Sequence, residues 1–169
     1  GAGKSSFVQA GLLPARPKGW APLQFKPGRA PFAALARALA PASGGDKASL
    51  GAGGTADDPQ RLFAAVEAWR RQHREVLLVV DQFEELFTQS EPSVRRAFAD
   101  LLARLAFEAD VHVLLSMRDD FLMRCYDLPA LAPIFSELTP LRPPFGSALR
   151  RAIVQPALKC GYRFETEAI

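Results

Sequence analysis

The sequence predicts an α/β domain built on a mainly parallel sheet that is covered by helices on both faces. Helical and strand-like patterns alternate from Ser5 to Leu141, as is typical of parallel sheets, whose successive strands need a crossover that is usually a helix. The run Val76–Val80 is apolar without alternation, which favours a strand buried on both faces. Asp81 follows this run directly, at the strand end where open α/β sheets bind ligands. The predicted architecture therefore has three layers, α/β/α.

The first three predicted elements are a helix, a strand and a second helix. The first helix spans residues 6–13 and ends before Pro14. Residues 20–26 favour a short edge strand, because the proline within them is tolerated at the edge of a sheet. Pro31 begins an alanine-rich helix whose apolar residues fall at helical spacing. Residues 41–57 then form a glycine-rich, low-complexity loop, for which we find no functional interpretation.

The middle of the chain predicts two helices, each followed by a strand. Asp58 and the proline after it supply the cap and the first residue of the earlier helix. This helix ends in a cluster of arginines that suits the C-terminal end of its dipole, and it leads into the Val76–Val80 strand. The later helix begins at Pro92, and residues 111–116 form a second apolar strand. This part of the chain thus supplies two strands of the predicted sheet.

The last part of the chain predicts a further short strand and a kinked helix. The strand lies within residues 134–141 and is closed by prolines. The helix spans residues 147–159, with Pro156 as a kink and Gly161 as its C-cap.

Composition indicates an ordinary globular protein. The chain has 169 residues, of which 49% are hydrophobic and 23% are charged, values that argue against disorder. No apolar run approaches the length of a membrane span, so we expect a cytoplasmic protein with no membrane partner, in which Cys125 and Cys160 stay reduced. The net charge of +3 comes from scattered arginines. We therefore expect no direct nucleic-acid binding by this segment.

Gly1–Ser5 match the last five positions of the phosphate-loop motif GxxxxGK(S/T). Glycines allow backbone amides to turn toward phosphate oxygens, the lysine reaches the outer phosphates, and the hydroxyl of the last residue binds Mg²⁺. The chain begins inside this motif, so we expect a missing strand that lies in the middle of the sheet, beside residues 111–116 and near Val76–Val80. Without that strand, residues 1–169 alone are expected to fold poorly and to bind ATP weakly.

Half a motif alone is equally compatible with a glycine-rich turn and an exposed lysine. The later strand ending in Asp81 changes this balance, because P-loop NTPases pair the phosphate loop with such an aspartate. In that arrangement Asp81 holds Mg²⁺ through water, opposite Ser5. The two signals together favour nucleotide binding.

The segment Asp81–Phe87 (DQFEELF), with Gly3–Ser6 before it and Ser116–Leu122 (SMRDDFL) after it, resembles the novel STAND NTPases. These are signal-transduction ATPases related to NACHT and apoptotic ATPases. The resemblance extends over nearly the whole chain, including Trp20 and residues 151–165. It implies a P-loop NTPase core over residues 1–142, truncated within the phosphate loop. It also implies that residues 143–169 begin a helical lid.

The resemblance assigns roles by position. Asp81 matches the Walker B metal aspartate, and Gln82 stands where other ATPases have a glutamate. Glu84 and Glu85 are then the candidates to orient or deprotonate the attacking water, with Glu85 slightly favoured; the alternative is that both are exposed acids capping the next segment. Arg118 matches the sensor-1 arginine that reads the γ-phosphate, the alternative being a surface ion pair with Asp119 or Asp120. The complete set is catalytic Glu84, Glu85 and Arg118; nucleotide-binding Gly1, Ala2, Gly3, Lys4, Ser5 and Ser6; and metal-binding Ser5 and Asp81.

The resemblance implies a switch in a multidomain bacterial signalling or defence protein that binds ATP with Mg²⁺ and hydrolyses it slowly. Its partners are then effector and WD or TPR repeat domains of the same chain, with a homo-oligomer as the active form. The alternative is a non-hydrolysing, nucleotide-binding oligomerisation scaffold, a reading that Gln82 motivates. The sequence leaves open the stimulus, the effector and the choice of ATP over GTP.

Overall fold

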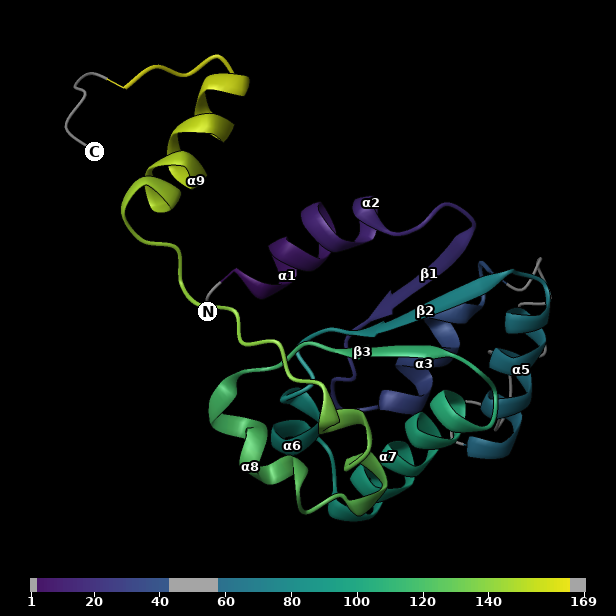
Figure 1. Cartoon of the computed structure of the whole chain (residues 1–169). Helices are drawn as coiled ribbons and strands as arrows, with labels where there is room; N and C mark the ends of the chain where they lie inside the picture. The colour runs from purple at the N-terminus through teal and green to yellow at the C-terminus, as the bar shows by residue number, and fades with distance from the viewer. Residues whose placement is uncertain (1–2, 43–57, 165–169) are drawn as a thin grey trace. The chain divides into compact units, whose positions relative to one another are not determined.

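The computed structural model describes residues 3–42 and 58–164 of the chain (Figure 1). Contacts within the chain group the described residues into two compact units. One contains residues 4–138, and the other contains Gly3 and the residues from Thr139 onward. The larger unit is an α/β structure with a parallel sheet, which confirms the predicted class.

The sheet contains the three parallel strands β1 (Trp20–Phe25), β2 (Glu75–Val80) and β3 (His112–Leu115), with β2 in the centre. The register pairs Trp20 with Glu75, and Leu77 with His112. All residues of β2 after Glu75 are buried, as expected for an apolar run without alternation. Among the described residues β3 has a strand partner on one edge, so the further strand expected beside it stays a prediction.

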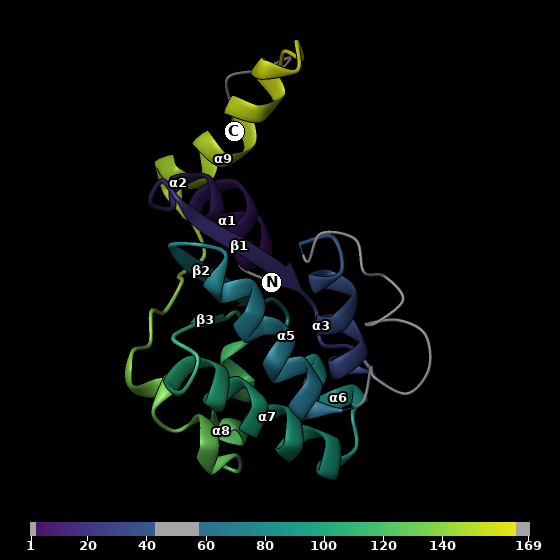
Figure 2. The same ribbon diagram turned by 90° about the vertical axis from the view of Figure 1, so that its right-hand side faces the viewer.

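One face of the sheet packs on the helices α3 (Pro31–Leu39), α5 (Pro59–Arg71) and α7 (Pro92–Phe107) (Figures 1 and 2). The start of α5 is as predicted: the Asp58 carboxylate accepts hydrogen bonds from the N–H groups of Gln60 (2.9 Å) and Arg61 (3.4 Å). The core on this face centres on aromatic and aliphatic side chains, among them Phe25, Phe32, Leu62, Trp69, Phe98 and Leu102.

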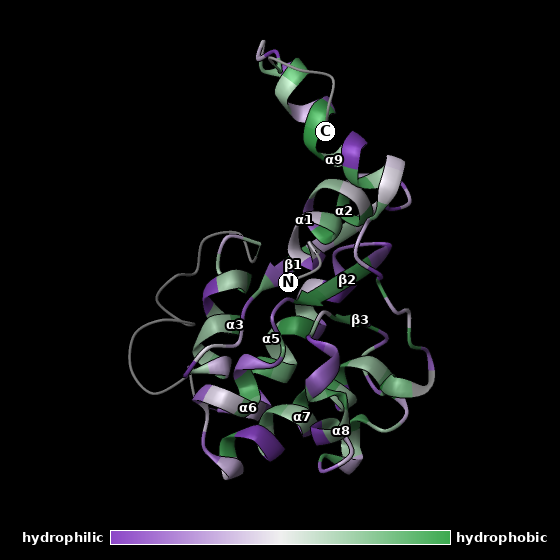
Figure 3. Cartoon of the chain, turned by 90° about the vertical axis from the view of Figure 1, so that its left-hand side faces the viewer, coloured by the Kyte–Doolittle hydropathy of each residue, from purple (hydrophilic) through white to green (hydrophobic). Residues whose placement is uncertain are grey.

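The opposite face of the sheet is covered by one helical segment near the N-terminus. It runs from α1 (Lys4–Phe7) through a π-helical turn (Val8–Leu12) to α2 (Leu13–Ala15), and so continues two residues beyond the predicted end. Side chains alternate across a strand, so Leu77 and Val79 of β2 meet Val8 here while their neighbours in β2 enter the main core. This unit therefore has the three predicted layers, with the sheet between two layers of helix. Figure 3 shows the apolar colouring of β2, the central strand of the sheet.

The prediction of a strand within residues 134–141 is wrong. Ile134–Ser136 form a turn of 3-10 helix, and residues 137–145 have no regular structure. Prolines at 133, 140, 143 and 144 remove backbone donors that a strand would need. Ile134 and Phe135 instead pack against the main core from this helical turn.

Short helical elements follow β2 and β3. They are α6 (Glu85–Gln89), a 3-10 turn over Asp119–Phe121, α8 (Leu122–Cys125) and a 3-10 turn over Pro129–Leu131. The second unit contains α9 (Gly146–Lys159), with Pro156 inside it. Gly161 follows with φ +81°, and the N–H groups of Gly161 and Tyr162 donate to the carbonyls of Leu158 and Ala157, which confirms the predicted glycine end of this helix. None of the described helices is both long enough and apolar enough to cross a membrane.

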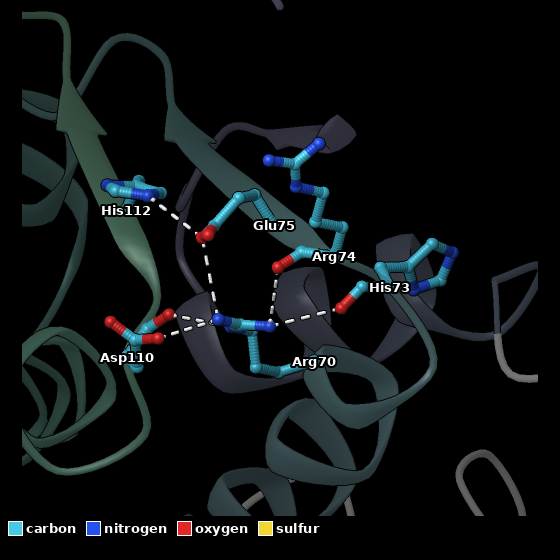
Figure 4. Close-up of polar contacts among 6 residues, drawn as sticks. All are labelled: Arg70, His73, Arg74, Glu75, Asp110 and His112. Atoms are coloured by element: carbon cyan, nitrogen blue, oxygen red, sulfur yellow. Dashed lines mark hydrogen bonds and ion pairs between the residues drawn. The ribbon is translucent and has the colours of Figure 1, made fainter. Parts of the chain in front are cut away.

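Arg70 fastens the amino ends of β2 and β3 to the end of α5 (Figure 4). Its guanidinium donates to the backbone carbonyls of His73, Arg74 and Asp110 at 2.8–3.0 Å. It also contacts the carboxylates of Asp110 (2.6 Å) and Glu75 (3.4 Å). This cluster lies at the end of the sheet opposite to Asp81.

The two cysteines are expected to differ sharply in reactivity. Cys125 is buried, its Sγ lies 3.6 Å from both Met117 Sδ and the Phe121 carbonyl, and burial raises the pKa of its thiol to about 12. Cys160 is exposed. Because the thiolate is the reactive form, we expect Ellman's reagent at pH 8 to modify Cys160 rapidly and Cys125 only after denaturation. A Cys160→Ser variant that still reacts at the rate of a free thiol would contradict this.

Candidate functional site

Asp81 is buried at the carboxyl end of β2. Its side chain is 1% exposed, and its Oδ1 accepts a hydrogen bond from the N–H of Gln82 (3.0 Å). Its Oδ2 is buried without a hydrogen-bond partner among the described residues. Leaving a buried carboxylate oxygen unpaired costs free energy, so this atom is suited to a ligand.

The turn after β2 fixes the direction of the chain beyond Asp81. Gln82 has φ +54°, a conformation that residues other than glycine adopt infrequently. Phe83 then donates its N–H to the Ser116 carbonyl (2.8 Å), and Ser116 donates its own N–H to the Val80 carbonyl (2.9 Å). The ends of β2 and β3 are thereby held together at one edge of the sheet.

Ser116 is a buried polar residue of this edge that the sequence analysis did not assign to the site. Its side chain is 8% exposed, and its Oγ has no hydrogen-bond partner among the described residues. The sequence feature that could have identified Ser116 is its position as the polar residue at the end of the second apolar strand. The carboxyl ends of parallel strands meet at one edge, so that position places it beside Asp81.

Glu84 and Glu85 have different surroundings. Glu85 Oε2 accepts a hydrogen bond from the N–H of Gly28 (3.2 Å), and Ser90 Oγ donates to the Gly28 carbonyl (3.1 Å). Glu85 therefore fastens the turn that follows β1. The Oε2 atom of Glu84 is buried and has no hydrogen-bond partner among the described residues. The charge of Glu84 acts instead on Arg118.

Arg118 follows β3 and pairs with Asp120 through two parallel hydrogen bonds. Nε donates to Oδ1 (3.0 Å) and Nη2 donates to Oδ2 (2.7 Å), with both side chains more than half exposed. The ion pair expected under the alternative interpretation of Arg118 is thus present with Asp120. Hydrogen bonding to Asp120 raises the pKa of Arg118, with a smaller contribution from Glu84.

The same hydrogen bonding lowers the pKa of Asp120, and the charge of Lys4 also contributes. The charge of Glu84 thus acts on Arg118, and the charge of Lys4 acts on Asp120. These groups come from the first helix, the turn after β2 and the segment after β3. In the sequence Asp120 was expected only as a possible ion-pair partner of Arg118 and not as a residue of the site.

The remaining predicted residues lie at the start of the chain. Gly1 and Ala2 lie outside the described residues. Gly3 has φ +73°, in the left-handed region that favours glycine. Lys4 and Ser5 are half-buried in the first turn of α1, and Ser6 is exposed. The segment that carries them packs through Val8 on β2, the strand that ends at Asp81.

A magnesium site of the nucleotide type fits these residues. The described residues contain no group of three or more histidine, cysteine or carboxylate side chains that could hold a metal by themselves. Mg²⁺ bound with a nucleotide needs fewer protein ligands, because phosphates and waters complete its octahedral shell. The unpaired Oδ2 of Asp81 and the hydroxyl of Ser5 are donors of the required kind.

Comparison with known protein families identifies a family to which the chain is similar. The model of the family Novel STAND NTPase 1 matches residues 1–169. No curated protein and no solved structure matches the chain significantly. Since the match extends over the whole chain, as the motifs around Lys4, Asp81 and Arg118 imply, the chain belongs to the novel STAND NTPase family.

Proposed function

We propose that this chain is the P-loop nucleotide-binding core of a molecular switch that binds ATP with Mg²⁺ and hydrolyses it slowly. Membership of the STAND NTPase family indicates a nucleotide-binding switch. The observation that carries the finer proposal is the buried carboxylate of Asp81, whose Oδ2 has no partner among the described residues. It stands at the carboxyl end of the central strand, where an open α/β sheet binds its ligand.

The residues at the start of the chain would hold the phosphates. Lys4 would supply a positive charge, and backbone N–H groups of Gly1, Ala2 and Gly3 are proposed to bind phosphate oxygens. Ser6 continues the first turn of the helix. Asp81 and the Ser5 hydroxyl would hold Mg²⁺, which when bound neutralises charge on the outer phosphates.

Glu84 is our candidate for the residue that accepts a proton from the attacking water. A general base needs a carboxylate oxygen that is available to the water. Oε2 of Glu84 is buried and has no hydrogen-bond partner among the described residues, so a water admitted with the nucleotide could bind it without displacing another donor, whereas Oε2 of Glu85 already accepts a hydrogen bond from Gly28. On these contacts we favour Glu84, whereas the sequence alone slightly favoured Glu85. Arg118 would bind the γ-phosphate, because its planar guanidinium can donate two hydrogen bonds to phosphate oxygens.

A second candidate function is a nucleotide-binding oligomerisation scaffold that does not hydrolyse ATP. Two observations favour it: Gln82 stands next to Asp81 in place of a carboxylate, and Glu85 is committed to a structural contact. In either case we propose residues 1–142 as the core and residues 143–169 as the start of a helical lid. We further propose a cytoplasmic, multidomain protein with effector and repeat domains in the same chain and a homo-oligomer as its active form.

The test of nucleotide binding is a Lys4→Ala substitution in the full-length protein. Loss of a charge-assisted hydrogen bond to phosphate is expected to weaken ATP binding by about 10- to 100-fold, measured by isothermal titration calorimetry with Mg²⁺. Lys18→Ala is the matched control, because Lys18 is exposed in the loop before β1. Equal affinities of the Lys4→Ala and Lys18→Ala proteins would overturn the proposed function.

A further inference from the structure

We propose that Asp120 is an intramolecular competitor of the nucleotide for Arg118, so that ATP binds by displacing the Asp120 carboxylate from the Arg118 guanidinium. This inference rests on the proposed function, and it adds to that function a residue that sets the affinity for the triphosphate. It starts from the bidentate pair, in which Nε and Nη2 of Arg118 face the two oxygens of Asp120 at 3.0 and 2.7 Å.

The competition follows from the shape of the guanidinium group. Its N–H donors form a fixed planar fork, and one edge of that fork binds one carboxylate or one phosphate bidentately. Asp120 occupies the Nε edge in this structure. A γ-phosphate that approaches the same edge forms its two hydrogen bonds only when the carboxylate leaves.

The local backbone keeps Asp120 within reach of Arg118. The N–H of Phe121 donates to the Arg118 carbonyl (3.2 Å), which closes a short 3-10 turn around Asp120. The buried Cys125 in α8 anchors the chain just beyond this turn. The carboxylate therefore competes from within the same chain at a high effective concentration.

Exposure of the pair makes it displaceable. The side chains of Arg118 and Asp120 are 58% and 53% exposed, and exposed ion pairs stabilise a structure only weakly. A competitor of this strength lowers the apparent affinity for a ligand by a small factor, because it reduces the fraction of protein with a free Arg118. The pair thus adjusts nucleotide binding without preventing it.

The neighbouring charges support an exchange of anions at this point. The charge of Lys4 acts on Asp120 in addition to that of Arg118, and the charges of Glu84 and, more weakly, Asp119 act on Arg118. The phosphates of a bound triphosphate would contact Lys4 and Arg118, the two cations that attract Asp120 in this structure. Hydrogen bonding to Arg118 lowers the pKa of Asp120, so the carboxylate stays ionised at neutral pH and the exchange needs no proton.

The test is the affinity of the full-length protein for ATP and for ADP after Asp120→Asn. Asparagine has nearly the same shape but no charge, so we expect ATP to bind about two- to fivefold more tightly. ADP affinity is expected to rise less, since ADP has no γ-phosphate for Arg118 to bind and gains only through the weaker interaction of Asp120 with Lys4. Asp119→Asn is the matched control: it removes the same charge one residue away, from a side chain that acts on Arg118 only through a smaller charge effect and forms none of the hydrogen bonds of the Arg118–Asp120 pair. It is expected to leave the ratio of ATP to ADP affinity unchanged.

A double-mutant cycle completes the experiment. In an Arg118→Ala background, Asp120→Asn is expected to leave ATP affinity nearly unchanged, because the group for which it competes is gone. The proposal is overturned if Asp120→Asn does not tighten ATP binding, if Asp119→Asn tightens it equally, or if the gain persists in full without Arg118. The proposed function is overturned by a different result, namely a wild-type protein that binds no ATP or binds it independently of Lys4. Failure of the Asp120 proposal can therefore be distinguished from failure of the proposed function.

Discussion

Glu84→Gln is expected to slow single-turnover ATP hydrolysis by about 10²- to 10⁴-fold, the usual contribution of a general base. The amide has nearly the shape of the carboxylate but cannot accept a proton from water. Because the buried Oε2 of Glu84 has no hydrogen-bond partner among the described residues, the substitution disturbs little else. ATP affinity is therefore expected to change much less than the rate of hydrolysis. Single-turnover assays on the full-length protein, with binding titrated separately, measure the two effects.

Glu85→Gln is the matched control for this prediction. The amide oxygen of glutamine can still accept the hydrogen bond from Gly28, so the turn after β1 is retained, and the rate of hydrolysis should stay within a few-fold of the wild-type rate. A larger loss for Glu85→Gln than for Glu84→Gln would show that the catalytic assignment is wrong. If neither variant is slower, the assignment of a general base to these two carboxylates is wrong, whereas a wild-type protein that binds ATP without hydrolysing it would favour the scaffold.

Arg70→Ala is expected to lower the free energy of unfolding by about 2–4 kcal/mol. The Arg70 side chain is only 18% exposed and donates to three backbone carbonyls and two carboxylates (Figure 4). Hydrogen bonds from a charged group contribute about 1.5–3 kcal/mol each, and partial exposure reduces the total. Removing the guanidinium also leaves Glu75 and Asp110 without their shared cation. Urea-induced unfolding followed by tryptophan fluorescence measures this loss.

Two further variants separate the geometry of Arg70 from its charge. Arg70→Lys keeps the charge but not the planar fork, so it should recover less than half of the lost stability. Arg71→Ala removes an adjacent arginine whose side chain is 72% exposed and which, in the part of the chain that the structure describes, pairs only with Glu67 in an i,i+4 ion pair. It should cost about 0.5 kcal/mol or less. Equal losses for Arg70→Ala and Arg71→Ala would contradict the role given to the Arg70 cluster.

The strands and the position of Asp81 could be predicted from the sequence because each depends on a local pattern. A five-residue apolar run bounded by charged residues specifies a buried strand, whatever its neighbours are. The proline-rich segment after Pro133 was predicted wrongly because its few apolar residues fit a short strand or a helical turn equally well. Packing of Ile134 and Phe135 on the core decides between them, and that packing is a property of the folded chain.

The different environments of Glu84 and Glu85 could not be predicted, although the two residues are adjacent. The distinction depends on Gly28, which lies 57 positions earlier in the chain and approaches only after β1 pairs with β2. The Arg70 cluster could not be predicted for the same reason, since its partner Asp110 lies 40 positions away from Arg70 in the chain. Sequence patterns place charged groups on elements, whereas pairing between distant elements requires the tertiary fold.

The segment that carries Lys4 and Ser5 is attached to the rest of the unit by little buried surface. Of residues 4–15 only Val8 is buried, whereas α7 buries five side chains. Local opening of such a segment costs less free energy than unfolding of the whole unit. A ligand held by Lys4 and Ser5 would then restrict the motion of this helix. The entropy cost of ordering the helix would reduce the observed free energy of ligand binding. Binding and local folding would thus be thermodynamically linked, so that the stability of this first layer reports the occupancy of the site.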